Sequence, residues 1–494
     1  MKIIQATLQK DVYKEFHVHA YHPDVKKVYS NYTNRSGKLS NIEGNEGVVF
    51  LGLQYFIKEY LMRTWNKTFF NVPKSTALEN HKQLLSNMLG YDVDVNYLGD
   101  LHDLGYLPLE IKALPEGTTV PYQVPCFTIV NTIDGFQWLT NMVETVLSSY
   151  IWSMSTSATT AKAYYDTFMK YANETSDTPE LVKFQGHDFS FRGMFGLESA
   201  IISGFSHLCS GFVGTDTIPA VKFAEDYYNA NSSNELVGCS VNATEHSVTC
   251  SWQNEGEIEF FKYLMNEVSP KGILSIVSDT WDFWKVVTEF LPELKETILL
   301  RDGKVVIRPD SGDPVNIICG KSLVENNTPE DKGLIECLWD IFGGTVNSKG
   351  YKVLHEKIGA IYGDSITLER QQSILNILKA KGFASTNIVL GIGSYTYQYV
   401  TRDTHGTAIK ATSVYRDNEW VPIYKNPKTD KSKKSLKGLL SVYEEKGKLK
   451  VKDNCSAEEE RQGLLKTIYK DGKHLVETSL KEIRSIIDDY KIRN

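Results

Sequence analysis

Four short apolar segments in the second half of the chain each run directly into a polar or charged tip, a pattern typical of an α/β barrel. They cover residues 273–280 (ILSIVSDT), 305–312 (VVIRPDSG), 358–365 (IGAIYGDS) and 387–394 (NIVLGIGS). A strand buried between a barrel interior and an outer layer of helices reads as a continuous run of Val, Ile and Leu. The catalytic residues of such barrels lie where the strands end. We therefore expect one rim of a barrel to hold the functional site.

The side chains at the four tips indicate a ligand that carries phosphates and hydroxyls. The tips hold Asp279, Arg308, Asp310, Asp364 and a Gly-Ile-Gly-Ser turn that ends at Ser394. Glycine lets backbone N–H groups approach phosphate oxygens, because no Cβ intervenes. Arg308 can present a planar fork of donors, and Asp310 points to the same side of an extended chain. The structural alternatives are an ordinary turn and an Arg–Asp pair at a strand end.

Length and local patterns predict two domains, with the barrel in the middle of the chain. The 494 residues exceed what one hydrophobic core normally supports. Strand and helix signals alternate over residues 150–395, and residues 367–381 predict a helix that begins with Thr367 as its N-cap. This helix joins two of the apolar segments, which predicts a parallel βαβ unit. Nearer the N-terminus, residues 46–60 predict a buried helix and residues 120–131 a strand.

Charge and hydropathy exclude several classes of protein. The formal net charge of −7 argues against a general nucleic-acid binder, although a local basic pocket remains compatible with it. The apolar stretch at residues 47–57 is too short to span a membrane, and the N-terminus has too short an apolar run for a signal peptide. Seven scattered cysteines without a CxxC pair fit a reducing compartment. We expect a cytoplasmic protein with no membrane or nucleic-acid partner.

Three further motifs carry residues suited to chemistry. His246 has Glu245 beside it and could meet Asp279 from another strand tip; a carboxylate on one ring nitrogen fixes the tautomer and frees the other nitrogen. Phe189 could present a flat face to an aromatic ligand, whereas aromatic residues at this spacing usually belong to a core. Asp216, in GTDT, could accept from an amide or be a turn residue. The HVHAYH segment at residues 17–22 lacks further ligands at known spacing, so a metal site there is disfavoured.

Over nearly its whole length the chain resembles the nicotinamide phosphoribosyltransferases of the type II phosphoribosyltransferase family. The matching segments include DVYKEFHVHAYHPDVKKVYS, LGYLPLEIKALPEGT, WLTNMVETVL, HDFSFRG, GTDT, EHS, VSDTWD, IRPDSGDP, YGD and TRD. The resemblance implies an atypical α/β barrel at residues 150–395, packed on a mixed α/β domain of residues 1–149 and 396–494. It implies transfer of 5-phosphoribosyl from 5-phosphoribosyl-1-pyrophosphate (PRPP) to nicotinamide in NAD salvage. It also implies a homodimer with shared sites, a requirement for Mg²⁺, and ATP as a co-substrate that phosphorylates a histidine.

The resemblance also implies a role for individual residues. His246 is expected to be phosphorylated, with Glu245 and Asp279 as orienting carboxylates, and Asp279 and Asp310 are candidate Mg²⁺ ligands. The remaining assignments concern the substrates: Phe189, Tyr13 of the partner subunit, Asp216, Arg192 and Arg308 for nicotinamide; Asp310, Gly363, Asp364, Gly393 and Ser394 for ribose and 5′-phosphate; and Arg35, Arg402, Lys410, Lys425 and Lys433 for pyrophosphate or ATP.

Two positions depart from the family pattern, and three other functions are alternatives. Ser394 stands where a glycine is usual, and Ala408 where a serine is usual, so binding of PRPP and ATP is affected more than reaction type. The nearest alternative is a nicotinate phosphoribosyltransferase, which Asp216 disfavours because a carboxylate repels a substrate carboxylate in a dry pocket. A catalytically silent binding protein of the same fold is the second alternative. A barrel glycoside hydrolase is the third, but it would have no use for the phosphate-binding cations.

Overall fold

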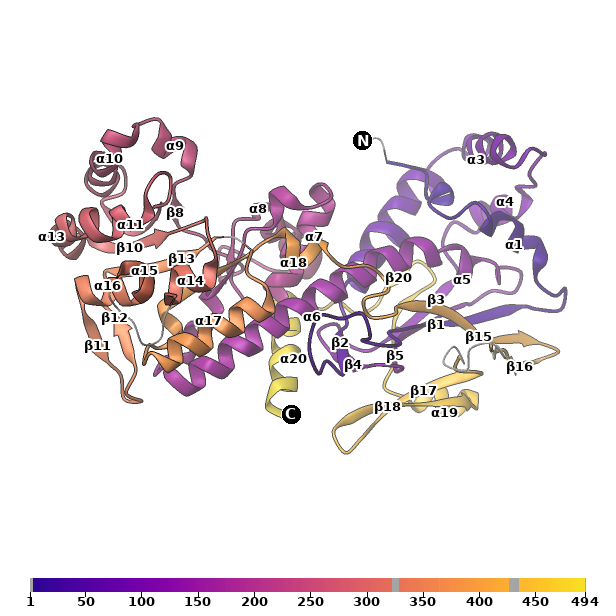
Figure 1. The fold of residues 1–494 in the computed structure, drawn as a ribbon. Coiled ribbons are helices and arrows are strands. Elements are labelled where there is room, and N and C mark those ends of the chain that lie inside the picture. Colours follow the sequence, from indigo (N-terminus) through magenta and orange to yellow (C-terminus); the bar gives the residue numbers. More distant parts are fainter. Residues whose placement is uncertain (1–2, 322–327, 364, 426–434, 494) are drawn as a thin grey trace. The chain divides into compact units, whose positions relative to one another are not determined.

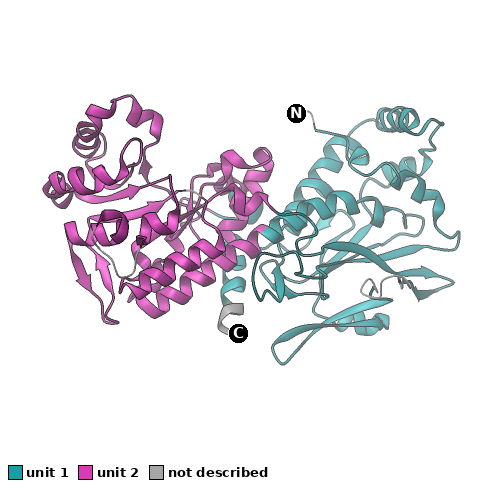
Figure 2. Ribbon diagram, in the orientation of Figure 1, with its two compact units in different colours: residues 1–156, 225–230, 400–494 teal, residues 157–224, 231–399 magenta. Residues whose placement is uncertain are grey.

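The computed structural model describes the backbone of residues 3–321, 328–363, 365–425 and 435–493, and it divides into two compact units (Figure 2). Residues 1–156, 225–230 and 400–494 form the first unit, and residues 157–224 and 231–399 form the second. The short segment 225–230 therefore leaves the second unit to join the first. No helix in the described ranges is long and apolar enough to cross a membrane.

The first unit is built on a seven-stranded sheet in the order β16-β15-β1-β5-β3-β19-β20, whose strands pair antiparallel. β5 lies at its centre, and both β5 and its neighbour β1 are almost entirely buried. The strands of this unit are β1 (Lys27–Thr33), β2 (Gly47–Val49), β3 (Leu109–Ala113), β4 (Thr119–Pro121), β5 (Pro125–Asn131), β15 (Ala408–Arg416), β16 (Glu419–Pro422), β17 (Leu439–Glu445), β18 (Lys448–Cys455), β19 (Lys466–Lys470) and β20 (Lys473–His474). Its main helices are α1 (Lys14–Ala20), η2 (Phe56–Thr64), α3 (Lys74–Leu89), α4 (Asn96–Leu104), α5 (Leu139–Met142), α19 (Ala457–Gln462) and α20 (Leu480–Arg493), and α6 (Glu144–Thr175) begins in it.

Two predictions for the first unit were wrong in detail. Residues 46–60 do not form one helix, because Gly47–Val49 pairs with β4 and the helix starts only at α2 (Leu53–Tyr55). Gly52 has a φ of 107° and turns the chain between the two. The buried carboxylate of Glu116 then accepts hydrogen bonds from the first N–H groups of that helix. Residues 120–131 form two strands instead of one, since Gln123 at φ 70° breaks them.

The second unit is a parallel barrel, as the sequence predicts. Seven strands lie in the order β7-β6-β14-β13-β10-β9-β8, and every neighbouring pair is parallel. Cys239 bridges to Gly214 of β7, and residues 242–243 pair with β9, so one stretch of chain connects both edges of the sheet. The strands are β6 (Gly186–Asp188), β7 (Gly214–Thr215), β8 (Asn242–Ala243), β9 (Lys271–Val277), β10 (Asp302–Arg308), β13 (Ile358–Tyr362) and β14 (Ile388–Ile392), with a separate hairpin of β11 (Gly344–Val346) and β12 (Lys352–Leu354).

The four apolar segments are adjacent strands of this barrel, in the order β14-β13-β10-β9. The predicted helix is α17 (Leu368–Ala380); the Thr367 side chain accepts from the N–H of Arg370, and the helix connects the parallel strands β13 and β14. α17 runs beside α6, where Gln371 donates to the backbone oxygen of Tyr164 at 2.9 Å (Figure 1). Other helices of this unit are α7 (Leu197–Cys209), α8 (Ile218–Tyr228, ending in the first unit), α9 (His246–Cys250), α10 (Glu257–Tyr263), α13 (Lys295–Leu300), α14 (Pro314–Cys319), α15 (Pro329–Lys332), α16 (Leu334–Phe342) and α18 (Ser394–Gln398).

Candidate active site

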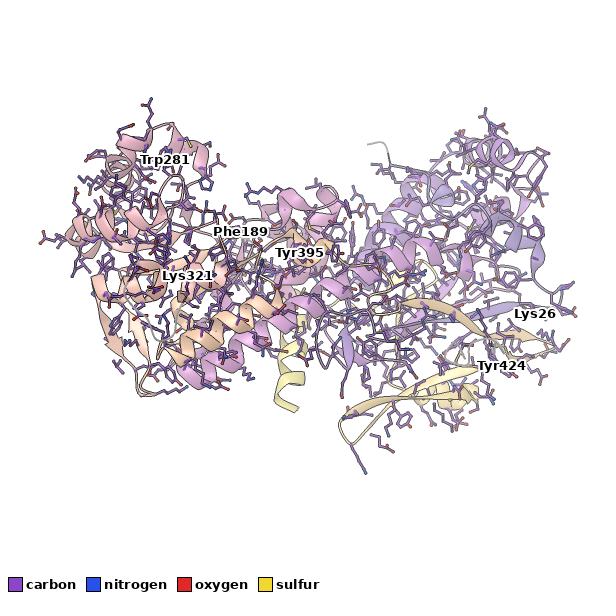
Figure 3. The ribbon with its side chains drawn as sticks, in the orientation of Figure 1. Lys26, Phe189, Trp281, Lys321, Tyr395 and Tyr424 are labelled. Atoms are coloured by element: carbon purple, nitrogen blue, oxygen red, sulfur yellow. The ribbon has the colours of Figure 1, made fainter. Side chains whose placement is uncertain are left out.

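The rim at the carboxyl ends of the barrel strands gathers the residues that the sequence singled out in the second unit. Because parallel strands end on the same side, the tips of β9, β10, β13 and β14 are neighbours. The tip of β6 joins them, since Phe189 donates its N–H to the backbone oxygen of Ile392 at 3.0 Å. Phe189, after β6, and Tyr395, on α18, mark this region in Figure 3. The rim is therefore built from five strand ends.

His246 faces two carboxylates at the start of α9. Its Nε2 lies 3.8 Å from Oδ1 of Asp279 and 3.9 Å from Oδ2 of Asp310, and its Nδ1 lies 3.1 Å from the hydroxyl of Thr280. Nearly half of the His246 side chain is exposed. The ring is thus held by the β9 tip on one nitrogen, while the other nitrogen points at the buried carboxylate of Asp279 and the partly exposed one of Asp310.

One oxygen of the Asp279 carboxylate is held by hydrogen bonds, and the other has none from the described residues. Oδ2 accepts from the N–H of Asp310 at 2.8 Å and from the hydroxyl of Ser311 at 2.6 Å. Oδ1 is buried and has no hydrogen-bond partner within the described part of the chain. Glu245, expected to orient His246, instead accepts from the hydroxyl of Ser247.

Asp216 lies immediately after β7, at the same rim of the barrel. Oδ1 of Asp216 accepts from Nε2 of His187 at 2.9 Å and from the hydroxyl of Ser240 at 2.5 Å. The ring of Phe189 lies 4.4 Å from that of His187, between centroids. Partial burial of Asp216 opposes its ionisation, but the hydrogen bonds from His187 and Ser240 and the charge of Arg308 outweigh it, and its pKa is lowered. Asp216 is therefore a charged acceptor beside an aromatic ring.

Asp188 supports this part of the rim, and the sequence did not single it out. Its carboxylate is fully buried and accepts from the N–H and hydroxyl of Ser190 and from the hydroxyls of Thr215 and Thr217. Those threonines flank Asp216, and Ser190 follows Phe189. One buried carboxylate thus fixes the backbone that carries Phe189 and Asp216. The sequence signal that could have identified it is the adjacent pair His187-Asp188, which directly precedes Phe189.

The two arginines expected to contact nicotinamide have different surroundings. Arg308 donates from Nη2 to the backbone oxygen of Thr244 at 2.6 Å, while its buried Nε has no partner among the described residues. Arg192 lies in η5 (Phe191–Gly193) and is exposed. Arg308 is consequently a fixed part of the rim, whereas Arg192 is available to a ligand.

The glycine turn after β14 opens into a cavity of about 720 Å³. Gly393 is the N-cap of α18, which Ser394 begins. Opposite them lies the first turn of α17, where Arg370 donates to the backbone oxygen of Ser365 at 2.6 Å. Sequence reasoning missed this arginine, although the predicted N-cap already placed it on the first turn of a helix at the rim. The cavity is lined by Val315, Ser365, Ile366, Thr367, Glu369, Arg370, Ser373, Gly393, Ser394, Tyr395 and Thr396.

Close packing explains the glycines at the tips of β13 and β14. A Cβ on Gly391 would lie 2.7 Å from Cδ2 of Phe189 and 2.8 Å from the backbone oxygen of Gly363. A Cβ on Gly363 would lie 2.7 Å from Oδ1 of Asp310. The side chains of Phe189 and Asp310 therefore pack directly on glycine backbone. Asp364, expected to contact ribose, lies outside the described residues.

The remaining expected residues belong to the first unit. Arg35 donates from Nε to the backbone oxygen of Gly406 at 2.6 Å. Burial lowers the pKa of Lys410, and the nearby charges of Arg35 and Lys425 lower it further. Lys410 and Lys425 line a cavity of about 420 Å³. These three cations therefore form one cluster that suits an anion.

Two other expected residues of this unit are exposed. Arg402 is exposed, and its Nη2 lies 3.7 Å from Oδ1 of Asp403. Tyr13 is also exposed, with its ring 5.1 Å from that of His17. Lys433 lies outside the described residues.

A parallel barrel whose rim carries a glycine turn, a cavity of about 720 Å³ and a charged acceptor fits an enzyme that transfers a phosphosugar to a nitrogen base. The chain belongs to the nicotinate phosphoribosyltransferase (NAPRTase) family, whose model matches residues 184–473. That match covers the whole rim described above.

Curated relatives match over nearly the whole chain. A nicotinamide phosphoribosyltransferase of Acinetobacter baylyi is 49% identical over 484 residues, which cover 96% of this chain and 95% of the relative. One of Xanthomonas campestris pv. campestris is 31% identical over 493 residues, covering 98% of each. Among solved structures, the fold resembles the nicotinate-nucleotide pyrophosphorylase of Pyrococcus furiosus (TM-score 0.59, 14% identity, 99% of this chain and 96% of that one). It also resembles the human nicotinic acid phosphoribosyltransferase (TM-score 0.58, 15% identity, 98% and 93%).

Proposed function

We propose that this protein transfers the 5-phosphoribosyl group of PRPP to nicotinamide, giving nicotinamide mononucleotide and pyrophosphate. The observation that carries the choice of base is the charged carboxylate of Asp216, held by His187 and Ser240 beside Phe189. An anionic acceptor pairs with the NH₂ of a carboxamide and repels the carboxylate of nicotinate. The relatives named above, which act on nicotinamide by their names, agree with this choice.

The residues of the rim suit the chemistry of this transfer. The bond from C1 of ribose to pyrophosphate breaks as the ring nitrogen of nicotinamide bonds to C1 from the opposite face. Phe189 would hold the base flat, and Asp310 and Gly363 would contact the ribose hydroxyls. The cavity beside Gly393 and Ser394, with Arg370 on its wall, has room for the 5′-phosphate. Fixed donors and cations at such positions stabilise charge that develops in the transition state.

Mg²⁺ is proposed to arrive with PRPP. Mg²⁺ usually binds one or two carboxylates together with substrate phosphates and water, rather than a cage of protein ligands. Asp279 and Asp310 fit this mode, because Oδ1 of Asp279 is an unpartnered buried oxygen in the described structure. The described residues contain no group of three or more His, Cys, Asp or Glu that would make a cage, at residues 17–22 or elsewhere. When bound, the ion would neutralise charge on the leaving pyrophosphate.

We further propose that ATP phosphorylates His246 and that two copies of the chain share each site. The carboxylates that face Nε2 of His246 would orient the ring. Tyr13 of the partner subunit would cover the second face of nicotinamide. The cluster of Arg35, Lys410 and Lys425, with Arg402 and Lys433, would bind pyrophosphate or ATP. Cytoplasmic location remains a prediction of the sequence.

A kinetic comparison tests the proposed function. Purified protein is supplied with PRPP and Mg²⁺, and pyrophosphate release is measured with nicotinamide or nicotinate, each with and without ATP. We expect nicotinamide to give the higher kcat/KM and ATP to increase the rate. Equal or faster use of nicotinate would favour the alternative phosphoribosyltransferase. No pyrophosphate under any condition would favour a silent binding protein.

A further inference from the structure

The carboxylate of Asp216 is asymmetric, because both of its described hydrogen bonds end on the same oxygen. Nε2 of His187 and the hydroxyl of Ser240 both donate to Oδ1, at 2.9 and 2.5 Å. Oδ2 receives no hydrogen bond from the described residues. The carboxylate therefore cannot rotate freely, and one oxygen is left to face a ligand.

Three separate stretches of the barrel create this arrangement. His187 lies on β6, paired with Gly214 of β7, and is mostly buried. Gly214 must lack a side chain, since a Cβ there would lie 2.8 Å from Nδ1 of His187. Ser240 follows Cys239, which bridges to Gly214 and joins the two edges of the barrel. Since a carboxylate only accepts, Nε2 of His187 carries the proton.

We propose that His187 and Ser240 are positioning residues that set selectivity for the amide, by occupying Oδ1 of Asp216 and reserving Oδ2 for the carboxamide NH₂. The inference rests on the proposed function and deepens it. Neither residue needs to touch the substrate. Their effect passes through the orientation and charge of Asp216.

The physical reason lies in what Asp216 could do without its two donors. An unsupported carboxylate beside an apolar ring more readily rotates, takes up a proton or binds water. A protonated Asp216 would present a donor, and a donor tolerates the carboxylate of nicotinate. Loss of the donors should therefore weaken nicotinamide use and relieve the exclusion of nicotinate, so the ratio of the two kcat/KM values falls.

The test measures kcat/KM for nicotinamide and for nicotinate in four variants of the full-length protein. Ser240→Ala removes one donor at an exposed position, so the core is left intact. His187→Leu removes the other donor, and His187→Gln keeps an N–H at similar reach. Ser348→Ala is the matched control. It deletes the same kind of serine–aspartate hydrogen bond, 2.6 Å to Asp177, away from the rim in the same unit.

We expect Ser240→Ala to lower the nicotinamide-to-nicotinate ratio about tenfold, the effect of one hydrogen bond to a charged group. His187→Leu should do the same, whereas His187→Gln should recover most of the ratio and Ser348→Ala should keep it. The inference is overturned if the wild type prefers nicotinamide and Ser240→Ala leaves the ratio within about twofold. It is equally overturned if both substrates lose activity in parallel, which is the signature of a structural role. A wild type without a preference for nicotinamide refutes the proposed function itself, a result that is distinct from both.

Discussion

Nε2 of His246 lies 3.8 Å from Oδ1 of Asp279, a buried oxygen without a hydrogen-bond partner within the described residues. The other oxygen of Asp279 is held by Asp310 and Ser311. The aspartate is thus anchored to the β10 tip and presents its free oxygen to the imidazole.

Asp279→Asn should reduce the stimulation of the reaction by ATP. Asparagine keeps the shape of the side chain but removes the charge that faces His246. We expect the ATP-dependent increase in rate to fall about tenfold, equivalent to about 1.4 kcal/mol, with a smaller effect on the rate without ATP. Initial rates of nicotinamide mononucleotide formation with and without ATP give the ATP-dependent increase and the rate without ATP. Asp282→Asn is the control, because Asp282 only caps a short helix three residues further along. Undiminished stimulation in Asp279→Asn would contradict the proposed role.

Gly391→Ala should displace Phe189 without unfolding the barrel. The added Cβ would lie 2.7 Å from Cδ2 of Phe189. It cannot move away from the ring, because the backbone oxygen of Gly363 would lie only 2.8 Å from it. We expect the KM for nicotinamide to rise about three- to tenfold, which corresponds to loss of one aromatic contact.

Gly359→Ala is the matched control, on a neighbouring strand of the same barrel. A Cβ there would lie 3.4 Å from Cδ of Lys304, near an ordinary contact, so the KM should stay unchanged. Steady-state kinetics together with circular dichroism separate displacement of the ring from loss of folding. An unchanged KM in Gly391→Ala would mean that Phe189 does not bind the base.

Gly193 and Ser394 should show strong coupling in a double-mutant cycle. A Cβ on Gly193 would lie 2.0 Å from Oγ of Ser394 and 2.5 Å from its Cβ. Gly193→Ala should therefore disturb the turn at the phosphate cavity and raise the KM for PRPP about tenfold or more. Adding Ser394→Gly, which restores the glycine usual in the family, should recover most of the loss. Additive effects of the two changes would show that the contact has no influence on the turn.

Glu116→Gln should flatten the dependence of stability on pH. Burial raises the pKa of Glu116 to about 7, despite hydrogen bonds from the N–H groups of Gly52, Leu53 and Gln54. Between the ordinary glutamate pKa of 4.5 and about 7, the folded protein retains a proton that the unfolded chain releases, so stability falls as pH rises through this range. The loss attributable to this group is about 3 kcal/mol.

Melting temperatures at about pH 5 and pH 8, on either side of this range, check the prediction. The wild type should lose more stability than Glu116→Gln as pH rises. Glu43→Gln, at an exposed position of the same unit, is the control and should behave as the wild type. An equal pH dependence in the wild type and Glu116→Gln would refute the assignment.

Local patterns in the chain predicted those elements whose signals lie close together in sequence. The apolar runs gave the strands β9, β10, β13 and β14, and Thr367 marked the start of α17 correctly. Residues 46–60 were mispredicted because β2 pairs with β4, some seventy residues away, and the helix that follows depends on Glu116. A carboxylate that caps a helix from another part of the chain leaves no trace in the sequence of that helix.

The sequence by itself determined the family, the barrel and the residue types at its rim, because strand tips carry their chemistry in short contiguous motifs. Only the tertiary structure decided how these residues meet. It placed His187 and Ser240, 29 and 24 residues from Asp216 along the chain, on a single carboxylate oxygen, and turned Glu245 toward Ser247. It also left one oxygen of Asp279 open to His246. Side-chain direction depends on packing between strands that are distant in sequence, and for that reason spacing alone does not reveal it.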